Sequence, residues 1–572
     1  MLTHAILYAV AMTYSIIGVT LILAFTIIII MLYRKKRNSE KAIAEKVRAG
    51  WSHPKEGPWP FYHIKKYAEV DHNPEHYNLP QRTRDDIDFE ELFSFIDRTS
   101  SKVGQQYLYR RITSPTGHME ESLKNLTLLF SKNATIREKV LKQISVLNSN
   151  DAYFITSLLR SELMSRPSWL NSIYLSNFFI IILLIFSLQY QVLLIFLLVP
   201  FTANMLVHYW NKTNTFQFVR SFPQLSILVD VASGLNREHE LKVKGVAECV
   251  SILRPFQWKI RFISMSSGGP KDEVNQIVSY LIELVKGFFL MEVLMLFHLV
   301  KALDSRRSSA HFLFKYVGQI DMALSIASLR AGSLKTCQPE FIQNKKEMVM
   351  TNVYHPLIPN CVTNNLSIKG KSILITGSNM SGKTTFLRTI ILNCILGQSI
   401  DTCFADEFKT PVLQPLSAIR IDDDILEGKS YYFEEVSVIG SLVKEAGNTA
   451  QHLFVLDEVF KGTNTLERVA AAKAVLSYLT RNNHIVIVST HDVELSEMLN
   501  AEYELYHFTE TIQDSTFHFD HKIKPGSLPI TSFNAIRILE LLDFPGTIIS
   551  EAKYLRNKRH QAAISRRRKN NS

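Results

Sequence analysis

The sequence predicts an α/β domain in the C-terminal part of the chain and membrane-spanning helices before it. Short apolar runs at 373–375, 453–456 and 484–488 each end in polar residues, and segments with helical periodicity separate them. Alternation of buried strands and helices is typical of a parallel sheet that collects its ligands at the carboxyl edge of the strands. Two charge-free apolar stretches, 5–33 and 167–211, are long enough to cross a membrane.

The first apolar stretch predicts a transmembrane helix over residues 1–33. It exceeds the ~20 residues that a span needs, and a basic cluster at 34–37 comes directly after it. A signal peptide would carry its positive charge before a shorter apolar core. Basic residues after the span place that end of the helix in the cytoplasm. Residues 34–84, which contain several Trp and Pro residues, predict an irregular juxtamembrane connector.

The second stretch is too long for one span and predicts a transmembrane hairpin at about 171–210 that turns near 187–191. A single span would place the C-terminal domain outside the cell. A buried hairpin of a soluble domain is the alternative. A third apolar segment, 277–300, carries three charged residues, which cost several kcal/mol at the bilayer centre, so it predicts a core helix instead. We therefore expect about three transmembrane helices in the inner or plasma membrane, with the α/β domain in the cytoplasm.

The α/β domain contains a phosphate-binding loop between a buried strand and a helix. Backbone N–H groups of such a loop cradle phosphate oxygens, and the helix dipole adds partial positive charge. Lys383 would reach the β- and γ-phosphates of ATP, and the hydroxyl of Thr384 would ligate Mg²⁺. The predicted nucleotide-binding residues are Gly377, Ser378, Asn379, Met380, Ser381, Gly382, Lys383, Thr384 and Thr385.

Polar residues also end the next two predicted strands. Asp457 follows the run 453–456 and is placed to hold Mg²⁺, while Glu458 can orient or deprotonate the attacking water. His491 follows the run 484–488 and could contact the γ-phosphate or that water. Each of these residues could instead lie at the surface without a function, but their order after a phosphate-binding loop argues against that interpretation.

Together these motifs resemble the MutS family of DNA mismatch-repair proteins, a branch of the ABC-type ATPases. The family's T-G-P-N-M-G-G-K-S-T loop corresponds to residues 376–385, with Asn-Met as its diagnostic pair. The family's D-E-x-x-x-G-T-S-T corresponds to 457–465, and its A-T-H to 489–491. Its signature region, D-D-x-x-x-G-x-S-T-F-x-x-E, corresponds to 423–435.

The resemblance implies Mg²⁺-dependent ATP hydrolysis in a composite site of a homodimer. Ser430 would contact the γ-phosphate of ATP held by the partner subunit. An ordinary helix N-cap is the alternative for Ser430, and the two roles are compatible because a capped helix N-terminus also binds anions. The catalytic residues would be Glu458, Lys383 and His491, and the Mg²⁺ ligands Thr384 and Asp457.

The resemblance also extends upstream and sets the expected domains. Residues 85–340 would form a MutS-like helical core and lever domain that contains the hairpin, 341–555 the ATPase domain and 556–572 a basic tail. The family's N-terminal mismatch-recognition and connector domains have no counterpart, so the chain resembles a membrane-anchored form that lacks them. Cys361 stands where the family has its adenine-stacking aromatic residue, which leaves base selectivity undecided.

Net charge and cysteine content bear on DNA binding and on the cellular compartment. The formal net charge of +11 comes entirely from residues 34–37 and 556–572, so bulk charge indicates no general basic DNA-binding face. The five cysteines show no metal-binding spacing and are consistent with reduced thiols in a cytosolic domain. Two hypotheses remain: ATP hydrolysis coupled to DNA binding, as the family implies, or a non-DNA mechanoenzyme or scaffold that acts on membrane partners. A transporter fits the motifs less well.

Overall fold

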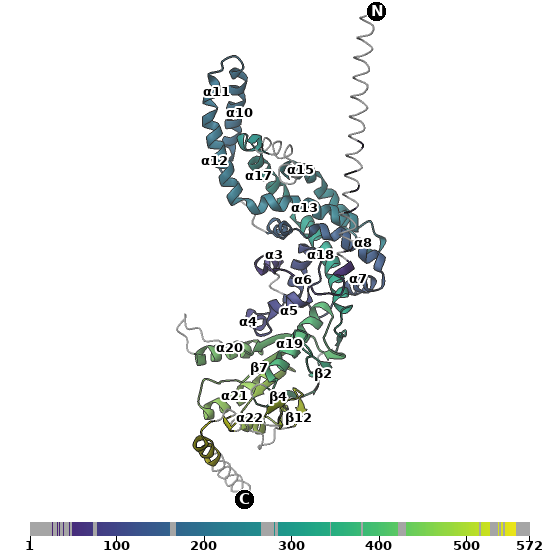
Figure 1. The fold of residues 1–572 in the computed structure, drawn as a ribbon, viewed down its shortest axis with the longest axis vertical. Coiled ribbons are helices and arrows are strands. Elements are labelled where there is room, and N and C mark those ends of the chain that lie inside the picture. The colour runs from purple at the N-terminus through teal and green to yellow at the C-terminus, as the bar shows by residue number, and fades with distance from the viewer. Residues whose placement is uncertain are drawn as a thin grey trace, which may run out of the picture. The chain divides into compact units, whose positions relative to one another are not determined.

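The computed structural model of the 572-residue chain describes residues 26, 31, 34, 38, 45, 48–71, 77–160, 167–264, 280, 284–343, 345–378, 381–420, 431–513, 516–526, 536, 539–540 and 544–555. The chain divides into two compact units (Figure 1). Unit 1 comprises residues 1–70, 97–107 and 125–331, and unit 2 comprises 71–96, 108–124 and 332–572.

Unit 2 is built on a six-stranded sheet of order β12-β9-β4-β8-β7-β6. The five strands from β9 to β6 are parallel, and β12 is antiparallel to β9. The three apolar runs identified in the sequence form β4, β8 and β7, which are neighbours in this order. The strands are β4 (Ser372–Thr376), β6 (Gln414–Ala418), β7 (His452–Asp457), β8 (Ile485–Thr490), β9 (Tyr503–His507) and β12 (Lys524–Pro525).

Helices cover both faces of this sheet. Three helices, α20 (Tyr431–Glu445), α21 (Thr465–Leu479) and α22 (Val493–Met498), bury apolar residues such as Leu442 and Leu476 against Phe454 and Val486. Helix α19 (Lys383–Ile400) contacts β6, β7 and β8 but adds no residue to this cluster. Since strand side chains alternate between faces, α19 packs on the opposite face.

A second sheet of unit 2 has four strands in the order β1-β5-β2-β3. These are β1 (Glu340–Phe341), β2 (Glu347–Val353), β3 (Asn364–Lys369) and β5 (Glu407–Thr410). A separate antiparallel pair joins β10 (Glu510–Gln513) to β11 (Thr516–Phe519). The connection between β2 and β3 carries Cys361.

Unit 2 also includes two segments that the sequence analysis assigned to the connector and the helical domain. These are 71–96, with α4 (Gln81–Asp86) and α5 (Phe89–Ile96), and 108–124. The carboxylate of Asp86 is buried and accepts hydrogen bonds from Ser417 Oγ at 2.6 Å and from the backbone N–H of Arg420 at 2.8 Å. Helix α4 is thereby joined to the carboxyl end of β6.

Unit 1 is helical, and α18 (Arg307–Arg330) is almost completely buried from Leu313 to Leu329. Its other helices are α2 (Phe61–Ile64), α3 (Lys66–Val70), the first part of α6 (Lys102–Thr113), most of α7 (Glu121–Lys132), α8 (Ala134–Ile144), η1 (Ser145–Leu147), η2 (Asn150–Phe154), α9 (Ile155–Leu159), α13 (Phe216–Leu235), η3 (His239–Leu241), α14 (Val246–Leu253), η4 (Arg254–Phe256), α15 (Gln257–Ser264) and α17 (Met291–Asp304), besides the hairpin described below.

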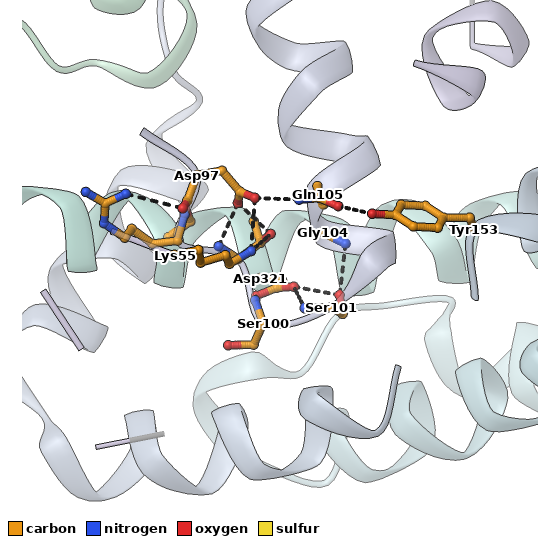
Figure 2. Close-up of polar contacts among 11 residues, drawn as sticks. Lys55, Asp97, Ser100, Ser101, Gly104, Gln105, Tyr153 and Asp321 are labelled. Carbon is orange, nitrogen blue, oxygen red and sulfur yellow. Dashed lines mark hydrogen bonds and ion pairs between the residues drawn. The ribbon is translucent and has the colours of Figure 1, made fainter. Parts of the chain in front are cut away.

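Two buried carboxylates, Asp321 on α18 and Asp97 before α6, hold the start of α6 and the connector (Figure 2). The fully buried carboxylate of Asp321 accepts hydrogen bonds from the N–H groups of Ser100 and Ser101, both at 2.8 Å, and from Ser101 Oγ at 2.6 Å. A Cβ on Gly104 would lie 2.1 Å from Asp321 Oδ2, so only glycine fits there. Asp97 is likewise buried and pairs with Lys55 Nζ at 2.9 Å.

The predicted hairpin is formed by α10 (Leu170–Ser187), α11 (Leu193–Phe196) and α12 (Leu198–Asn214) (Figure 1). Two segments are long and apolar enough to cross a membrane, Leu170–Ser187 and Leu193–Trp210, with mean hydropathy of 2.0 and 1.7. Only 22% and 17% of their residues are buried, so most of this apolar surface is exposed. The predicted span over residues 1–33 lies almost entirely outside the described residues.

The apolar segment 277–300 is not one continuous helix in its described part. Leu290 has a left-handed backbone with φ of +47°, and α17 begins only at Met291. Each arm of the hairpin supplies an amide to this break: Asn177 Nδ2 donates to the carbonyl of Phe289 at 2.8 Å, and Asn204 Nδ2 to that of Phe288 at 2.6 Å. Two carbonyls at the break therefore gain partners that a continuous helix would have supplied.

Candidate functional site

The predicted phosphate-binding loop lies between β4 and α19. Gly377 and Gly382 have φ of +152° and +107°, values that favour glycine. A Cβ on Gly377 would lie 3.0 Å from the carbonyl oxygen of Phe508, and one on Gly382 would lie 3.1 Å from His521 Nδ1. Glycine is thus required at both ends of the loop. Asn379 and Met380 lie outside the described residues.

Lys383 is folded back into the loop that precedes it. Its Nζ donates to the carbonyl oxygens of Gly377 and Ser378, both at 2.8 Å, and lies 3.4 Å from His491 Nε2. The residue is only 5% exposed, so its positive charge stays at the mouth of the loop. Ser381 closes the turn, because its Oγ donates to the carbonyl of Ser378 at 2.8 Å. Thr385, the last residue of the predicted set, lies in the first turn of α19.

The two predicted Mg²⁺ ligands meet at the carboxyl edge of the sheet. Thr384 Oγ1 donates to Asp457 Oδ2 at 2.5 Å. Ser489, opposite Asp457 in the β7–β8 register, donates to its Oδ1. A hydroxyl and a carboxylate are hard oxygen donors that suit Mg²⁺, which takes its remaining ligands from water and phosphate. No cluster of three or more metal-binding side chains occurs in the described part of the chain, so these residues suit a metal shared with a nucleotide rather than a closed protein cage.

Glu458 is held by two cationic or hydrogen-bonding side chains. His491 Nε2 lies 2.7 Å from its Oε1, and Lys461 Nζ lies 3.0 Å from its Oε2. Burial opposes ionisation of this carboxyl, but the hydrogen bonds from His491 and Lys461 outweigh it and lower the pKa of Glu458 to about 2. Glu458 is therefore a carboxylate at neutral pH, in the position where the sequence predicts a water-orienting group.

His491 is positioned by residues that the sequence analysis did not single out. Arg468 on α21 makes a bidentate pair with Asp492, with Nε–Oδ2 at 3.0 Å and Nη2–Oδ1 at 2.7 Å. The N–H of Asp492 donates to Thr490 Oγ1 at 3.1 Å. Lys461 occupies a variable position of the 457–465 motif and Arg468 follows that motif, and no sequence pattern distinguishes either from other surface basic residues.

A cavity of about 450 Å³ adjoins the loop. Lys383, Thr384, Thr385 and Glu458 line the side next to the predicted phosphate-binding loop. Its other side is formed by the β2–β3 connection and by residues after β9, namely Val353, Tyr354, Ile358, Pro359, Asn360, Cys361, Val362, Asn364, Phe508 and His521. The volume is within the range of small-molecule sites. Cys361 thus lines the same cavity as the phosphate-binding loop, and His521 is a ring-bearing residue there that the sequence analysis missed.

Ser430 lies outside the described residues, so its role remains a prediction. The helix that follows it, α20, connects to the site through Glu435. This carboxylate is fully buried, and it accepts hydrogen bonds from the N–H of Lys461 at 2.9 Å and of Gly462 at 3.3 Å. Glu435 therefore joins α20 to the loop that follows Glu458.

Comparison with known proteins agrees with these features. Residues 373–559 match the family model described as MutS domain V. DNA mismatch repair protein MutS of Thermus thermophilus is 29% identical over 205 residues, which cover 35% of this chain and 25% of the relative. The protein of the same name from Petrotoga mobilis is 33% identical over 254 residues, which cover 41% of this chain and 30% of the relative. The match to Lactobacillus delbrueckii MutS is 32% over 228 residues, 38% and 26% of the two chains. The chain thus spans about a quarter to 30% of the length of these relatives.

Proposed function

We propose that this chain, whose residues 373–559 match the MutS domain V family model, binds and hydrolyses ATP with Mg²⁺ at the carboxyl edge of the six-stranded sheet. The observation that carries the proposal is the convergence of two separate segments at one cavity, where Lys383, Thr384 and Glu458 line the wall and Asp457 bonds to Thr384. Such an arrangement suits phosphoryl transfer, in which catalysis consists mainly of positioning and electrostatic stabilisation.

Each residue has a defined task in this proposal. The loop N–H groups and Lys383 bind the β- and γ-phosphates and stabilise the charge that develops on them. Thr384 and Asp457 would hold Mg²⁺, which neutralises phosphate charge when bound. Glu458 orients the attacking water through a carboxylate oxygen, and His491 contacts the γ-phosphate from the neighbouring strand.

We further propose that the active form is a homodimer with composite sites, in which Ser430 reaches the partner's nucleotide. Exposed apolar side chains next to the site support a docking face. Phe433 and Val436 on α20 are 60% and 40% exposed, and Leu466 at the start of α21 is 84% exposed. A group of large exposed apolar residues is more common at an interface than on a free surface.

Membrane anchoring is also part of the proposal. The hairpin presents large apolar side chains such as Ile185 and Phe186, which are 61% and 54% exposed. Trp169 and Trp210 contact each other at its base, with ring centroids 6.0 Å apart. Tryptophan is enriched at membrane interfaces. The hairpin would therefore sit in the bilayer with the tryptophan pair at the cytoplasmic boundary.

What the ATPase drives is proposed from two different observations. The relatives are named DNA mismatch repair proteins, which favours coupling of ATP hydrolysis to DNA binding. The exposed apolar hairpin favours the second candidate, a mechanoenzyme or scaffold that acts on membrane partners.

Steady-state ATPase assays of the detergent-purified protein, with and without homoduplex, mismatched and branched DNA at physiological salt, test both candidates. Turnover that Lys383→Ala abolishes and that DNA changes supports the first. Lys383-dependent turnover that is indifferent to every DNA favours the second. Normal turnover in Glu458→Gln, which should bind ATP without hydrolysing it, contradicts the catalytic assignment.

A further inference from the structure

Both carboxylate oxygens of Glu458 already accept from a positively charged or hydrogen-bonding side chain. Its Oε1 is bonded to His491 and its Oε2 to Lys461, at 2.7 and 3.0 Å. A carboxylate that orients water must accept a hydrogen bond from that water. A water molecule at Glu458 therefore competes with these two donors, and it is bound and activated better once one of them has left.

Lys461 is the partner that is easier to release. Its side chain is 44% exposed, so water replaces the ion pair at little cost. His491 is held more firmly, because the adjacent Asp492 makes a bidentate pair with Arg468. Release of Lys461 frees Oε2 without moving the segment that carries His491.

The backbone that carries Lys461 is held in an unusual conformation. Glu458 and Phe460 both have left-handed backbones, with φ of +53° and +63°, although neither is glycine. Such residues cost free energy and persist only where the surroundings enforce them.

Glu435 holds the next part of this loop from α20. Its carboxylate accepts hydrogen bonds from the N–H groups of Lys461 and Gly462 and is completely buried. The loop should therefore move together with α20. Helix α20 begins at Tyr431, directly after the predicted signature residue Ser430. A displacement of α20 when a partner nucleotide is engaged would pass through Glu435 to Lys461.

We propose that Lys461 is a positioning residue that keeps Glu458 inactive, and that Glu435 couples its release to the movement of α20. The inference rests on the proposed ATP hydrolysis and adds a built-in brake to it. The brake prevents turnover until α20 has moved, so that hydrolysis follows assembly of the composite site.

The test compares kcat and KM for ATP of the full-length wild-type protein with those of Lys461→Met, Lys461→Arg and the exposed α20 control Lys444→Met. Since an exposed ion pair holds weakly, we expect Lys461→Met to raise kcat about two- to tenfold with KM unchanged. Lys461→Arg keeps the pair and should turn over at the wild-type rate, as should Lys444→Met. Equal or lower kcat in Lys461→Met, or a higher KM, overturns the proposal.

A double-mutant cycle tests the role of Glu435. Glutamine can accept only one of the two backbone hydrogen bonds, so Glu435→Gln should also raise kcat, and the double variant Glu435→Gln/Lys461→Met should be no faster than Lys461→Met alone. Independent, multiplicative effects would refute the coupling. Melting temperatures show whether Glu435→Gln folds.

The same experiment separates this inference from the proposed function. If wild type turns over ATP in a Lys383-dependent manner but Lys461→Met is no faster, only the brake is wrong. If the wild-type protein shows no ATPase activity and Lys461→Met does, Lys461 blocks hydrolysis completely, which supports the proposal. If both are silent, the proposed ATPase function fails with it.

Discussion

Thr384 at the start of α19 donates a 2.5 Å hydrogen bond to Asp457 at the end of β7, although 73 residues separate them in the chain. The contact forms because β4, β8 and β7 are parallel neighbours, so the loop after β4 and the last residue of β7 lie at the same edge of the sheet. A hydroxyl and a carboxylate at this distance can share one divalent cation.

Asp457→Asn should therefore weaken the use of Mg²⁺. The amide removes the negative charge and one oxygen donor, so we expect the Mg²⁺ concentration for half-maximal ATPase activity to rise at least about tenfold. A magnesium titration of ATPase activity measures this. Ser489→Ala, which leaves the carboxylate in place and removes only its hydrogen bond, is the control and should have a smaller effect. An unchanged titration curve in Asp457→Asn would exclude Asp457 as a ligand.

Asp321→Asn should destabilise unit 1, even though it removes a buried charge. Burial raises the pKa of Asp321 to about 6, against the opposing effect of its hydrogen bonds, so the group is mainly a carboxylate at neutral pH. All three of its partners donate, and an amide would turn an N–H group toward one of them. We expect a loss of about 2–4 kcal/mol in the free energy of unfolding.

Tryptophan fluorescence in a urea titration measures this loss, because all five tryptophans of the chain lie in unit 1. Ser100→Ala serves as the matched control. Ser100 bonds Asp321 through its backbone N–H, which alanine keeps, so its effect should stay within about 0.5 kcal/mol. Ser101→Ala loses the hydroxyl donor and should fall between the two variants. Equal stability of Asp321→Asn and wild type would contradict the argument.

His452→Phe should make unit 2 less sensitive to acid. Burial lowers the pKa of His452 to about 4, with the nearby His484 acting in the same direction. Between pH 6.5 and 4 the unfolded chain binds a proton at this residue and the folded chain does not, so stability falls as the pH falls through that window. The variant should avoid about 1.4 kcal/mol of loss per pH unit.

Hydrogen exchange of the β7 amides at pH 6.5 and 5 measures this difference, since it reports opening of the strand that begins at His452. His507→Phe, at a partly exposed position on β9, is a suitable control and should leave the pH dependence as in wild type. The prediction is wrong if protection in β7 declines equally with acid in wild type and His452→Phe.

The hairpin tip should lie on the opposite side of the membrane from α14. Each arm has 18 residues, and at ~1.5 Å per residue this gives ~27 Å, close to the hydrocarbon thickness. In a background without the native cysteines, Gln189→Cys should react with an impermeant maleimide added to intact cells, and Glu248→Cys on α14 only after permeabilisation. Labelling of both only after permeabilisation would indicate the alternative, a hairpin that does not cross.

The sequence predicted secondary structure best where a pattern of neighbouring residues specifies the element. The apolar runs formed β4, β7 and β8, and the hairpin turns between Ser187 and Leu193 as its composition predicts. Within 277–300, by contrast, periodicity gave no sign of the break at Leu290. Residues 71–96 pack in unit 2, because the buried Asp86 takes its partners from Ser417 and Arg420, far along the chain.

The amino-acid sequence by itself determined that a glycine-containing turn links β4 to α19 and that acidic residues end β7, because short-range patterns of glycine, apolar and polar residues specify strand, turn and helix. Only the tertiary structure decided which side chains those motifs meet. The pairing of Lys461 with Glu458, and the hold of Glu435 on the loop that carries Lys461, depend on how α20 packs on the sheet. Such contacts arise from the burial of a whole apolar face, and no local pattern of residues encodes them.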